Sequence, residues 1–366
     1  MLIDLTRKLI DIPSVSGEER DVTLFLATLL TELGYAVETQ EVTNGRANIF
    51  ATVRGFAPRV VFSSHTDTVP PFISATEDER FVYGRGACDT KGIIAAQITA
   101  AETLRAGNFN ELGLLYVVDE ELGSLGARRA NSHPRAGECR YLINGEPTQN
   151  QLAIGSKGSL RLKLAAEGRA AHSAYPEEGE SAVEKLLDAL ARVRAARWPI
   201  DDFFGDTTCN IGVLKAGTRP NVIAAHAEAE LQIRLVTPSS VVKQILEQVV
   251  GESARVEVMS VTEPVRMMDV PGFQRSVVRF TTDVPHLTNW GEPLLIGPGS
   301  ILDAHTAQER ISKRELHEAV ELYARLARTL WPGTKRQRKV PHDEARTDRL
   351  RSDEPLGSPA RSASRT

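Results

Sequence analysis

Short apolar runs alternate with longer helical stretches through the first part of the chain. The runs Val60–Ser63, Gly113–Val118 and Tyr141–Ile143 have the length and continuity of buried strands. Between them, Gly92–Arg105 is rich in alanine and apolar on one face, and a second helix is predicted over Gly123–Asn131. This alternation predicts an α/β fold in which helices cover both faces of a sheet.

The N-terminal region predicts a helix followed by a hairpin. Ser16–Glu19 matches a capping box, and the amphipathic run after it extends to about Leu33. Two strand-like segments come next, Tyr35–Gln40 and Ala47–Arg54. Asn44-Gly45 between them favours a tight turn, so these segments are predicted to pair.

The order of elements changes near Gly155. The segments that follow are predicted as strand, helix, two strands, helix and strand, which is the order of a ferredoxin-like split motif. The expected strands are Leu160–Ala166, Thr207–Lys215, Ala227–Val236 and Ala254–Val261, with helices over Ser181–Val193 and Ser239–Val250. We interpret this block as a domain inserted at residues 158–263.

The first domain is predicted to resume after the insertion, so that residues 1–157 and 264–333 belong together. It continues with strands Ser276–Thr281 and Pro293–Ile296 and closes with a helix capped by Ser312 and Glu315. From Thr334 the chain is basic and then rich in proline, serine and arginine, without apolar periodicity. This composition predicts a disordered tail over residues 334–366.

Composition narrows the choice of partner and compartment. The chain has 366 residues and a formal net charge of −4, so two domains are expected, and nothing favours nucleic acid or an anionic membrane as a partner. The sequence shows neither a signal peptide nor an apolar run long enough to cross a membrane. The three cysteines are widely spaced, which argues against a disulfide framework and predicts a cytoplasmic protein.

Acidic side chains follow the predicted strands one after another. His65 and Asp67 close the first apolar run, and further acids stand at or just beyond the ends of later segments, at Asp89, Glu120-Glu121 and Glu146. Ligands of open α/β sheets bind outside the carboxyl ends of the strands, so one crevice is expected to collect these groups. A histidine with several carboxylates suits divalent metal, above all two zinc ions bridged by a carboxylate.

Six segments, in order along the chain, resemble the motifs of the M20 metallopeptidase and deacylase family. They are SSHTDTVPP, YGRGACDTKG, VVDEELGSLGA, INGEP, RAAHSAYPEEGESA and GPGSILDAHTAQE. The second and last look closest to acetylornithine deacetylase, with succinyl-diaminopimelate desuccinylase as a near relative. The resemblance implies an α/β zinc-hydrolase catalytic domain with a mixed sheet, interrupted by an inserted ferredoxin-like lid and dimerisation domain.

The same resemblance assigns the metal ligands. It implies that His65 and Glu146 bind one zinc, that Glu121 and His305 bind the second, and that Asp89 bridges both; cobalt is expected to substitute. Asp67 would orient His65. Glu120 would act as general base toward a water molecule activated by the metal.

Other residues are implied in substrate binding. His172, in the inserted domain, would stabilise the oxyanion, either from a partner subunit or after domain closure. Asn221 and Arg234 match positions that contact substrate, although a surface arginine remains an equally good interpretation of Arg234. Weaker candidates are Lys157, Tyr175, Gly299 and Ser300. The run Phe280–Asp283 departs from the glycine-led sequence of several relatives.

We therefore predict a homodimeric amidohydrolase that dimerises through the inserted domain. Its expected substrate is a small N-acyl amino acid, above all acetylornithine, or a short peptide. Desuccinylase, carboxypeptidase and dipeptidase activities remain alternatives. A non-catalytic binding protein of the same fold is the alternative from another class.

Overall fold

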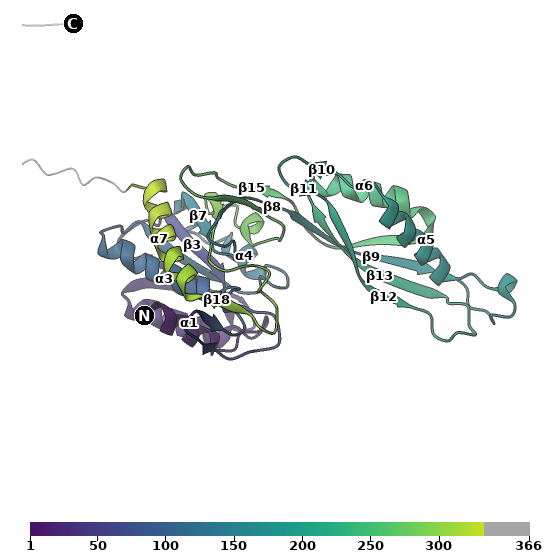
Figure 1. Ribbon diagram of the computed structural model, residues 1–366, viewed down its shortest axis with the longest axis horizontal. Coiled ribbons are helices and arrows are strands. Elements are labelled where there is room, and N and C mark those ends of the chain that lie inside the picture. Colours follow the sequence, from purple (N-terminus) through teal and green to yellow (C-terminus); the bar gives the residue numbers. More distant parts are fainter. Residues whose placement is uncertain (333–366) are drawn as a thin grey trace, which may run out of the picture. The chain divides into compact units, whose positions relative to one another are not determined.

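The computed structural model describes residues 1–332, so the predicted disordered tail lies outside the described residues (Figure 1). The helices are α1 (Leu2–Ile10), α2 (Arg20–Glu32), α3 (Lys91–Ala106), α4 (Leu125–Ala130), α5 (Ala182–Ala195), α6 (Ser239–Val250) and α7 (Lys313–Leu330). No helix within residues 1–332 is both long and apolar enough to cross a membrane.

Within residues 1–332, the strands form four sheets, of nine, four, three and two strands. They are β1 (Tyr35–Thr43), β2 (Arg46–Val53), β3 (Val60–His65), β4 (Thr76–Glu77), β5 (Phe81–Tyr83), β6 (Leu112–Val117), β7 (Tyr141–Asn144), β8 (Leu152–Ser156), β9 (Gly158–Glu167), β10 (Ile200–Asp201), β11 (Gly205–Asp206), β12 (Thr208–Ala216), β13 (His226–Leu235), β14 (Arg255–Thr262), β15 (Val265–Arg266), β16 (Arg275–Val278), β17 (Glu292–Leu295) and β18 (Arg310–Ser312).

Four central strands of the nine-stranded sheet run in the same direction. The order across the sheet is β1-β2-β6-β3-β7-β17-β8-β15, with β16 paired to β8. Strand β3 is parallel to β6 and β7, and β17 is parallel to β7. Every residue of β3 and β6 is buried, as expected of strands covered on both faces. Because these strands are parallel, β6, β3, β7 and β17 end at the same edge of the sheet.

Apolar side chains on the two faces of this sheet belong to different cores. Phe62 of β3 packs with helices α1, α2, α3 and α7, and its ring lies 5.2 Å from that of Tyr323. The neighbouring Val61 belongs to the cluster of α4 and Trp290, since alternate side chains of a strand point to opposite faces. The predicted α/β sheet with helices on both faces is therefore observed.

The four-stranded sheet has the order β12-β13-β9-β14, and each neighbouring pair is antiparallel. Buried residues alternate with less buried ones along β13, and α5 and α6 share a core with the buried face. These elements lie within residues 158–262 and follow the predicted β-α-β-β-α-β order. The domain limits at residues 158 and 263 stay a prediction.

Local signals at the ends of elements were partly misleading. The capping box predicted at Ser16–Glu19 is wrong: α2 begins at Arg20, and the Ser16 hydroxyl donates instead to Asp67 at 2.7 Å. The hairpin is confirmed, with both turn residues at positive φ (Asn44, 49°; Gly45, 76°). Sequence reasoning also misses α1, β8 and the three-stranded sheet of β18, β5 and β4.

We expect Gly126→Ala to destabilise the protein, because α4 approaches the end of β6 closely at this position. A Cβ atom on Gly126 would lie 2.2 Å from the carbonyl oxygen of Val118, a backbone atom that cannot move alone. The free energy of unfolding should fall by about 1–3 kcal/mol. Gly137→Ala is the control, because its Cβ would meet nothing within 4 Å. Equal denaturation midpoints for the two variants would contradict this account.

Candidate active site

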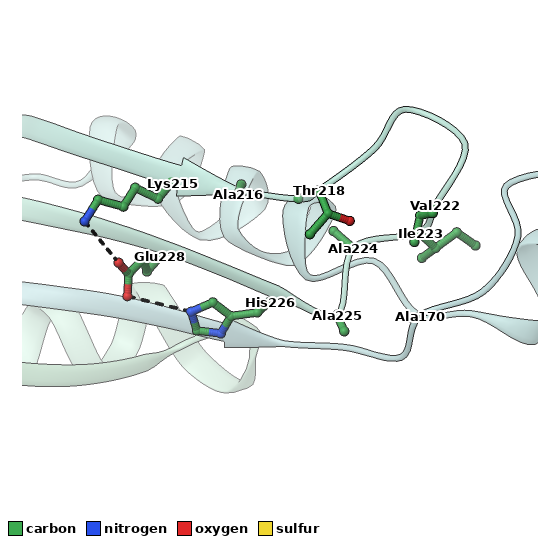
Figure 2. Close-up of a pocket in the computed structure, with 11 residues that line it drawn as sticks. Ala170, Lys215, Ala216, Thr218, Val222, Ile223, Ala224, Ala225, His226 and Glu228 are labelled. Atoms are coloured by element: carbon green, nitrogen blue, oxygen red, sulfur yellow. Dashed lines mark ion pairs between the residues drawn. The ribbon is translucent and has the colours of Figure 1, made fainter.

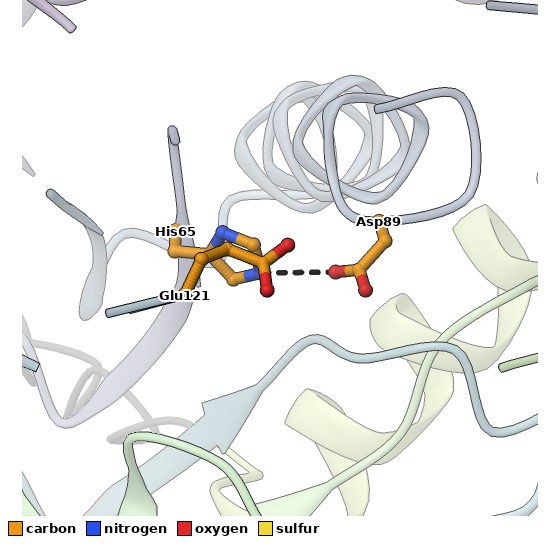
Figure 3. A group of neighbouring side chains, drawn as sticks. All are labelled: His65, Asp89 and Glu121. Carbon is orange, nitrogen blue, oxygen red and sulfur yellow. Dashed lines mark hydrogen bonds and ion pairs between the residues drawn. The ribbon is translucent and has the colours of Figure 1, made fainter. Parts of the chain in front are cut away.

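Two histidines and four carboxylates meet at the edge where the parallel strands end. This acid cluster consists of His65, Asp89, Glu120, Glu121, Glu146 and His305. His65 is the last residue of β3, and Glu146 stands two residues beyond β7. Asp89 lies in the loop before α3, and Figure 3 shows its carboxylate facing the ring of His65 with Glu121 beside them.

Asp89 lies between the two histidines. Its Oδ1 is 3.0 Å from His65 Nε2, and its Oδ2 is 3.3 Å from His305 Nε2. Glu121 Oε1 is 2.9 Å from the same atom of His305. One ligand atom each from His65, Asp89 and Glu121 lie within 4.8 Å of one another. A carboxylate with one oxygen toward each imidazole has the geometry to bridge two cations.

The four carboxylates of the cluster outnumber its two histidines and lie close enough to influence one another. Burial, together with the neighbouring carboxylates, raises the pKa of Glu120 and of Glu146 well above its usual range. Glu146 is buried, and its Oε1 has no hydrogen-bond partner among the described residues. Imidazole nitrogens and carboxylate oxygens are ligands of zinc. The residues present therefore fit a pair of divalent cations.

Asp67 fixes the backbone of the two neighbouring glutamates. Its carboxylate accepts hydrogen bonds from the backbone N–H groups of Glu120 (3.0 Å) and Glu121 (3.1 Å) and from the Ser16 hydroxyl. Nδ1 of His65 lies closer to the carbonyl oxygen of Asp67 (3.0 Å) than to its carboxylate (3.4 Å). The backbone of Asp67 thus orients His65, while its side chain holds the glutamate loop.

A buried ion-pair network also holds Asp119, the residue before the two glutamates. Asp119, directly before the two glutamates, has a left-handed backbone (φ 69°). Arg46 donates to Asp119 at 2.7 Å and to both oxygens of the fully buried Glu19. Glu19 in turn accepts from the Asp119 N–H. Sequence reasoning missed this network because Glu19 resembled an ordinary helix-capping residue.

A cavity of about 350 Å³ joins the acid cluster to side chains of the four-stranded sheet. Its lining includes Glu120, Thr281, Arg161, Gln232 and Arg234. Arg161 is paired with Glu230 at 2.7 Å, whereas the guanidinium of Arg234 has no ion pair or hydrogen bond with any residue in 1–332. Partial burial lowers the pKa of Arg234.

The run Phe280–Asp283 contributes to the same cavity. Phe280, Thr281 and Thr282 line it, and Asp283 is buried behind them. Burial raises the pKa of Asp283 to about 7, and the Ser124 hydroxyl opposes the shift. The unusual sequence of this run therefore does lie beside the acid cluster.

The other predicted substrate contacts in the inserted domain lie elsewhere. His172, Tyr175 and Asn221 are exposed and do not belong to the lining of this cavity. The Asn221 carbonyl accepts from the N–H of Ser173, which joins the two loops that carry them. Strand β9 separates these loops from the start of the four-stranded sheet by ten residues, roughly 30 Å.

Three weaker candidates are occupied by structural contacts. Lys157 is buried, and its ammonium group donates to the Asp206 carbonyl at 2.5 Å. The Gly299 N–H donates to Glu315, and the Ser300 carbonyl accepts from the Cys88 thiol. A substrate-binding role for these residues stays a prediction.

A second hollow, of about 440 Å³, lies in the inserted block and does not include the acid cluster (Figure 2). Glu228 pairs there with Lys215 and His226, at 3.7 Å in both cases. His226 also contacts Glu167. The titratable side chains of this hollow are thus paired with one another.

Comparison with known proteins identifies the family. The chain is 35% identical over 335 residues to a peptidase M20 domain-containing protein of Schizosaccharomyces pombe, covering 89% of this chain and 84% of the relative. The chain belongs to the M20 peptidase family. It is also 37% identical to a probable carboxypeptidase of Aspergillus clavatus, over 89% of this chain and 81% of that one. Family descriptions match at residues 154–257 (peptidase dimerisation domain) and 48–198 (peptidase family M28).

Solved structures agree on the fold. Aminopeptidase PepT from Bacillus cereus superposes with a TM-score of 0.73 at 19% identity, over 90% of this M20 peptidase and 98% of PepT. The M20 metallo-carboxypeptidase Sso-CP2 from Sulfolobus solfataricus gives 0.70 at 16% identity, over 88% and 97%. The predicted family and fold class are confirmed. The closer resemblance to acetylornithine deacetylase finds no support in these relatives, of which the Aspergillus protein is named a carboxypeptidase.

We expect a divalent cation to displace protons when it binds the acid cluster. Hydrogen bonds to Asp89 and Glu121 raise the pKa of His305 to about 10, so its imidazole holds a proton near neutral pH and must lose it to become a ligand. Zinc or cobalt affinity should therefore rise by about tenfold per pH unit for each proton released. Calorimetry in buffers of different ionisation enthalpy measures the number of protons released for each cation bound. An affinity independent of pH would contradict the assignment.

Proposed function

We propose that this M20 peptidase is a metallo-carboxypeptidase. It hydrolyses the amide bond that precedes an amino acid with a free α-carboxylate. The observation that carries the proposal is the cavity, whose lining includes both residues of the acid cluster and Arg234, with its unpaired guanidinium. The names of the Aspergillus relative and of Sso-CP2 support the same class. An N-acyl amino acid such as acetylornithine presents the same amide beside the same carboxylate, so deacylation is the second candidate.

Two divalent cations are proposed as cofactors, with zinc preferred and cobalt able to substitute. His65 and Glu146 would hold one cation, Glu121 and His305 the other, and Asp89 both. The YxeP protein of Bacillus subtilis, with a similar fold, is described as a dinuclear metal-binding peptidase of the M20 family. Bound there, the cations would lower the pKa of a water molecule and polarise the scissile carbonyl.

Glu120 is proposed as the general base. No described group donates a hydrogen bond to its carboxylate, whereas its backbone N–H is fixed by Asp67. Its raised pKa brings a carboxylate closer to the range in which it can both take and return a proton. Glu120 would accept the proton of the attacking water and deliver it to the nitrogen of the departing amino acid.

Arg234 is proposed to bind the free carboxylate of the substrate. A guanidinium can donate two parallel hydrogen bonds to a carboxylate, which fixes the direction of the adjoining amide. Because Arg234 is partly buried and has no partner in the described residues, it loses no existing ion pair when the substrate binds.

His172 is proposed to stabilise the oxyanion from a partner subunit. Within one chain, its loop follows the far end of β9 and does not line the cavity of the acid cluster. The match to a peptidase dimerisation domain covers this loop and strand β12. Strand β12 is an edge strand with exposed Val213 and Leu214, which makes it a suitable surface for a homodimer.

We expect Glu120→Gln and Glu121→Gln to fail in different ways. The first removes a proton acceptor, so turnover should fall by about 100-fold or more while two cations remain bound. The second removes a ligand, so one cation should bind more weakly. Metal analysis beside steady-state kinetics distinguishes the two variants. Equal and mild effects of both changes would refute the assignment of roles.

Substrate class is tested with dipeptides, their C-terminal amides, acetylornithine and succinyl-diaminopimelate assayed side by side. We expect cleavage of free-carboxylate substrates and little cleavage of the amides. Arg234→Met should raise KM for the free acids by about 10- to 100-fold, since charged hydrogen bonds contribute about 1.5–3 kcal/mol. Arg161→Met is the matched control, because its guanidinium already pairs with Glu230. Equal use of acids and amides by the unchanged enzyme would overturn the proposal.

Mixing variants tests whether His172 acts across subunits. His172→Ala should lower turnover by about 100-fold with metal content intact, as loss of an oxyanion donor does. When His172→Ala protein is mixed with Glu120→Gln protein and the subunits exchange, the mixture should recover up to roughly a quarter of wild-type activity. Half of the dimers then contain one chain of each kind, and each of these dimers has one complete site. A mixture of Glu120→Gln with Glu121→Gln should recover nothing. A dead mixture despite proven subunit exchange would favour closure within one chain.

A further inference from the structure

A fully buried carboxylate, Glu309, lies behind the loop that carries Asp89. Its Oε1 accepts hydrogen bonds from three backbone N–H groups of that loop, those of Gly86 (3.0 Å), Cys88 (3.1 Å) and Asp89 (3.1 Å). Glu309 does not line the cavity beside the acid cluster. It can therefore influence the chemistry only through the residues that it holds.

Arg85 joins this carboxylate to the segment that carries His305. Its Nη1 donates to Glu309 Oε2 at 2.5 Å and to the carbonyl of Thr306, the residue after His305, at 3.2 Å. Both side chains of the ion pair are almost completely buried. The pair thus connects two loops that lie more than 200 residues apart in the sequence.

The three N–H groups depend on this single acceptor. A buried donor without a partner costs about 1–3 kcal/mol, so a loop that lost Glu309 would have to rearrange to find other acceptors. Asp89 would move with it, because its own N–H is one of the three. Its oxygens now face His65 at 3.0 Å and His305 at 3.3 Å, and a small rotation would remove one of these approaches.

We propose that Glu309 and Arg85 are positioning residues that hold Asp89 as a bridge, so that two cations bind side by side. The inference rests on the proposed function in one respect, the presence of cations at the acid cluster. It adds residues to which neither the motifs nor the comparisons give a role. Loss of the Glu309 acceptor should weaken the binding of the cation that Asp89 shares with His305, while the protein stays folded.

The test is a titration of chelator-treated full-length protein with cobalt, in which binding is monitored by visible absorption and by calorimetry. Glu309→Leu should lower the affinity for the second cobalt ion by about 10- to 100-fold, as the loss of a residue that holds a metal ligand does. Glu309→Gln keeps an amide oxygen for the three N–H groups and should bind cobalt more tightly than Glu309→Leu. The control is Glu102→Leu, which removes a carboxylate bonded to Tyr35 and Arg105.

Several outcomes would overturn the proposal. Unchanged cobalt stoichiometry and affinity in folded Glu309→Leu would do so, and so would an equal loss in Glu102→Leu, which would indicate general destabilisation. If Glu309→Leu does not fold, Arg85→Met is measured instead, because it breaks the link to Thr306 and keeps the Glu309 acceptor. An unchanged affinity of Arg85→Met for the second cobalt ion would then overturn the proposed positioning role. If the unsubstituted protein binds two cobalt ions but cleaves none of the substrates, the proposed function is refuted and the positioning role of Glu309 and Arg85 is not.

Discussion

Carboxylates crowded at one edge of the parallel sheet are the constraint on which the rest of this structure depends. Glu120, Glu121 and Glu146 each have a pKa raised first by burial and then by their acidic neighbours. Groups that repel one another stay close only if the backbone beneath them is fixed. Strands β3, β6 and β7 provide the fixed edge, because both of their faces are packed with helices.

The loops beyond these strands are fixed by a repeated device, a buried carboxylate that accepts backbone N–H groups. Asp67 holds the N–H groups of Glu120 and Glu121, and Glu309 holds the loop of Asp89. These acceptors satisfy backbone donors that would otherwise be buried without partners. Asp67, whose pKa is lowered by its contacts with His65, also brings negative charge close to the site, whereas the charge of Glu309 is balanced by Arg85.

The acid cluster could be predicted because most of its members follow an apolar run, and parallel strands place such positions together. His305 was found only through the family-like motif, since no strand end marks it. The supporting residues could not be predicted, because their partners are remote: Glu309 reaches Asp89 across 220 positions. Arg234 shows the same limit. The alternation along β13 places it on the less buried face, but only the fold brings that face to the cavity.

Arg234 and His172 lie toward opposite ends of the four-stranded sheet, and this separation assigns their proposed roles to different chains of a dimer. Arg234 pairs in register with Ser159, beside the connection between the two blocks, where Gly158 lies so close to Thr262 that a Cβ would meet its carbonyl at 2.5 Å. His172 lies beyond the opposite end of β9. Arg234 lines the cavity of the acid cluster in its own chain, so the proposed binding of the substrate carboxylate needs one chain alone. The His172 loop does not line that cavity, so the proposed stabilisation of the oxyanion needs the partner subunit.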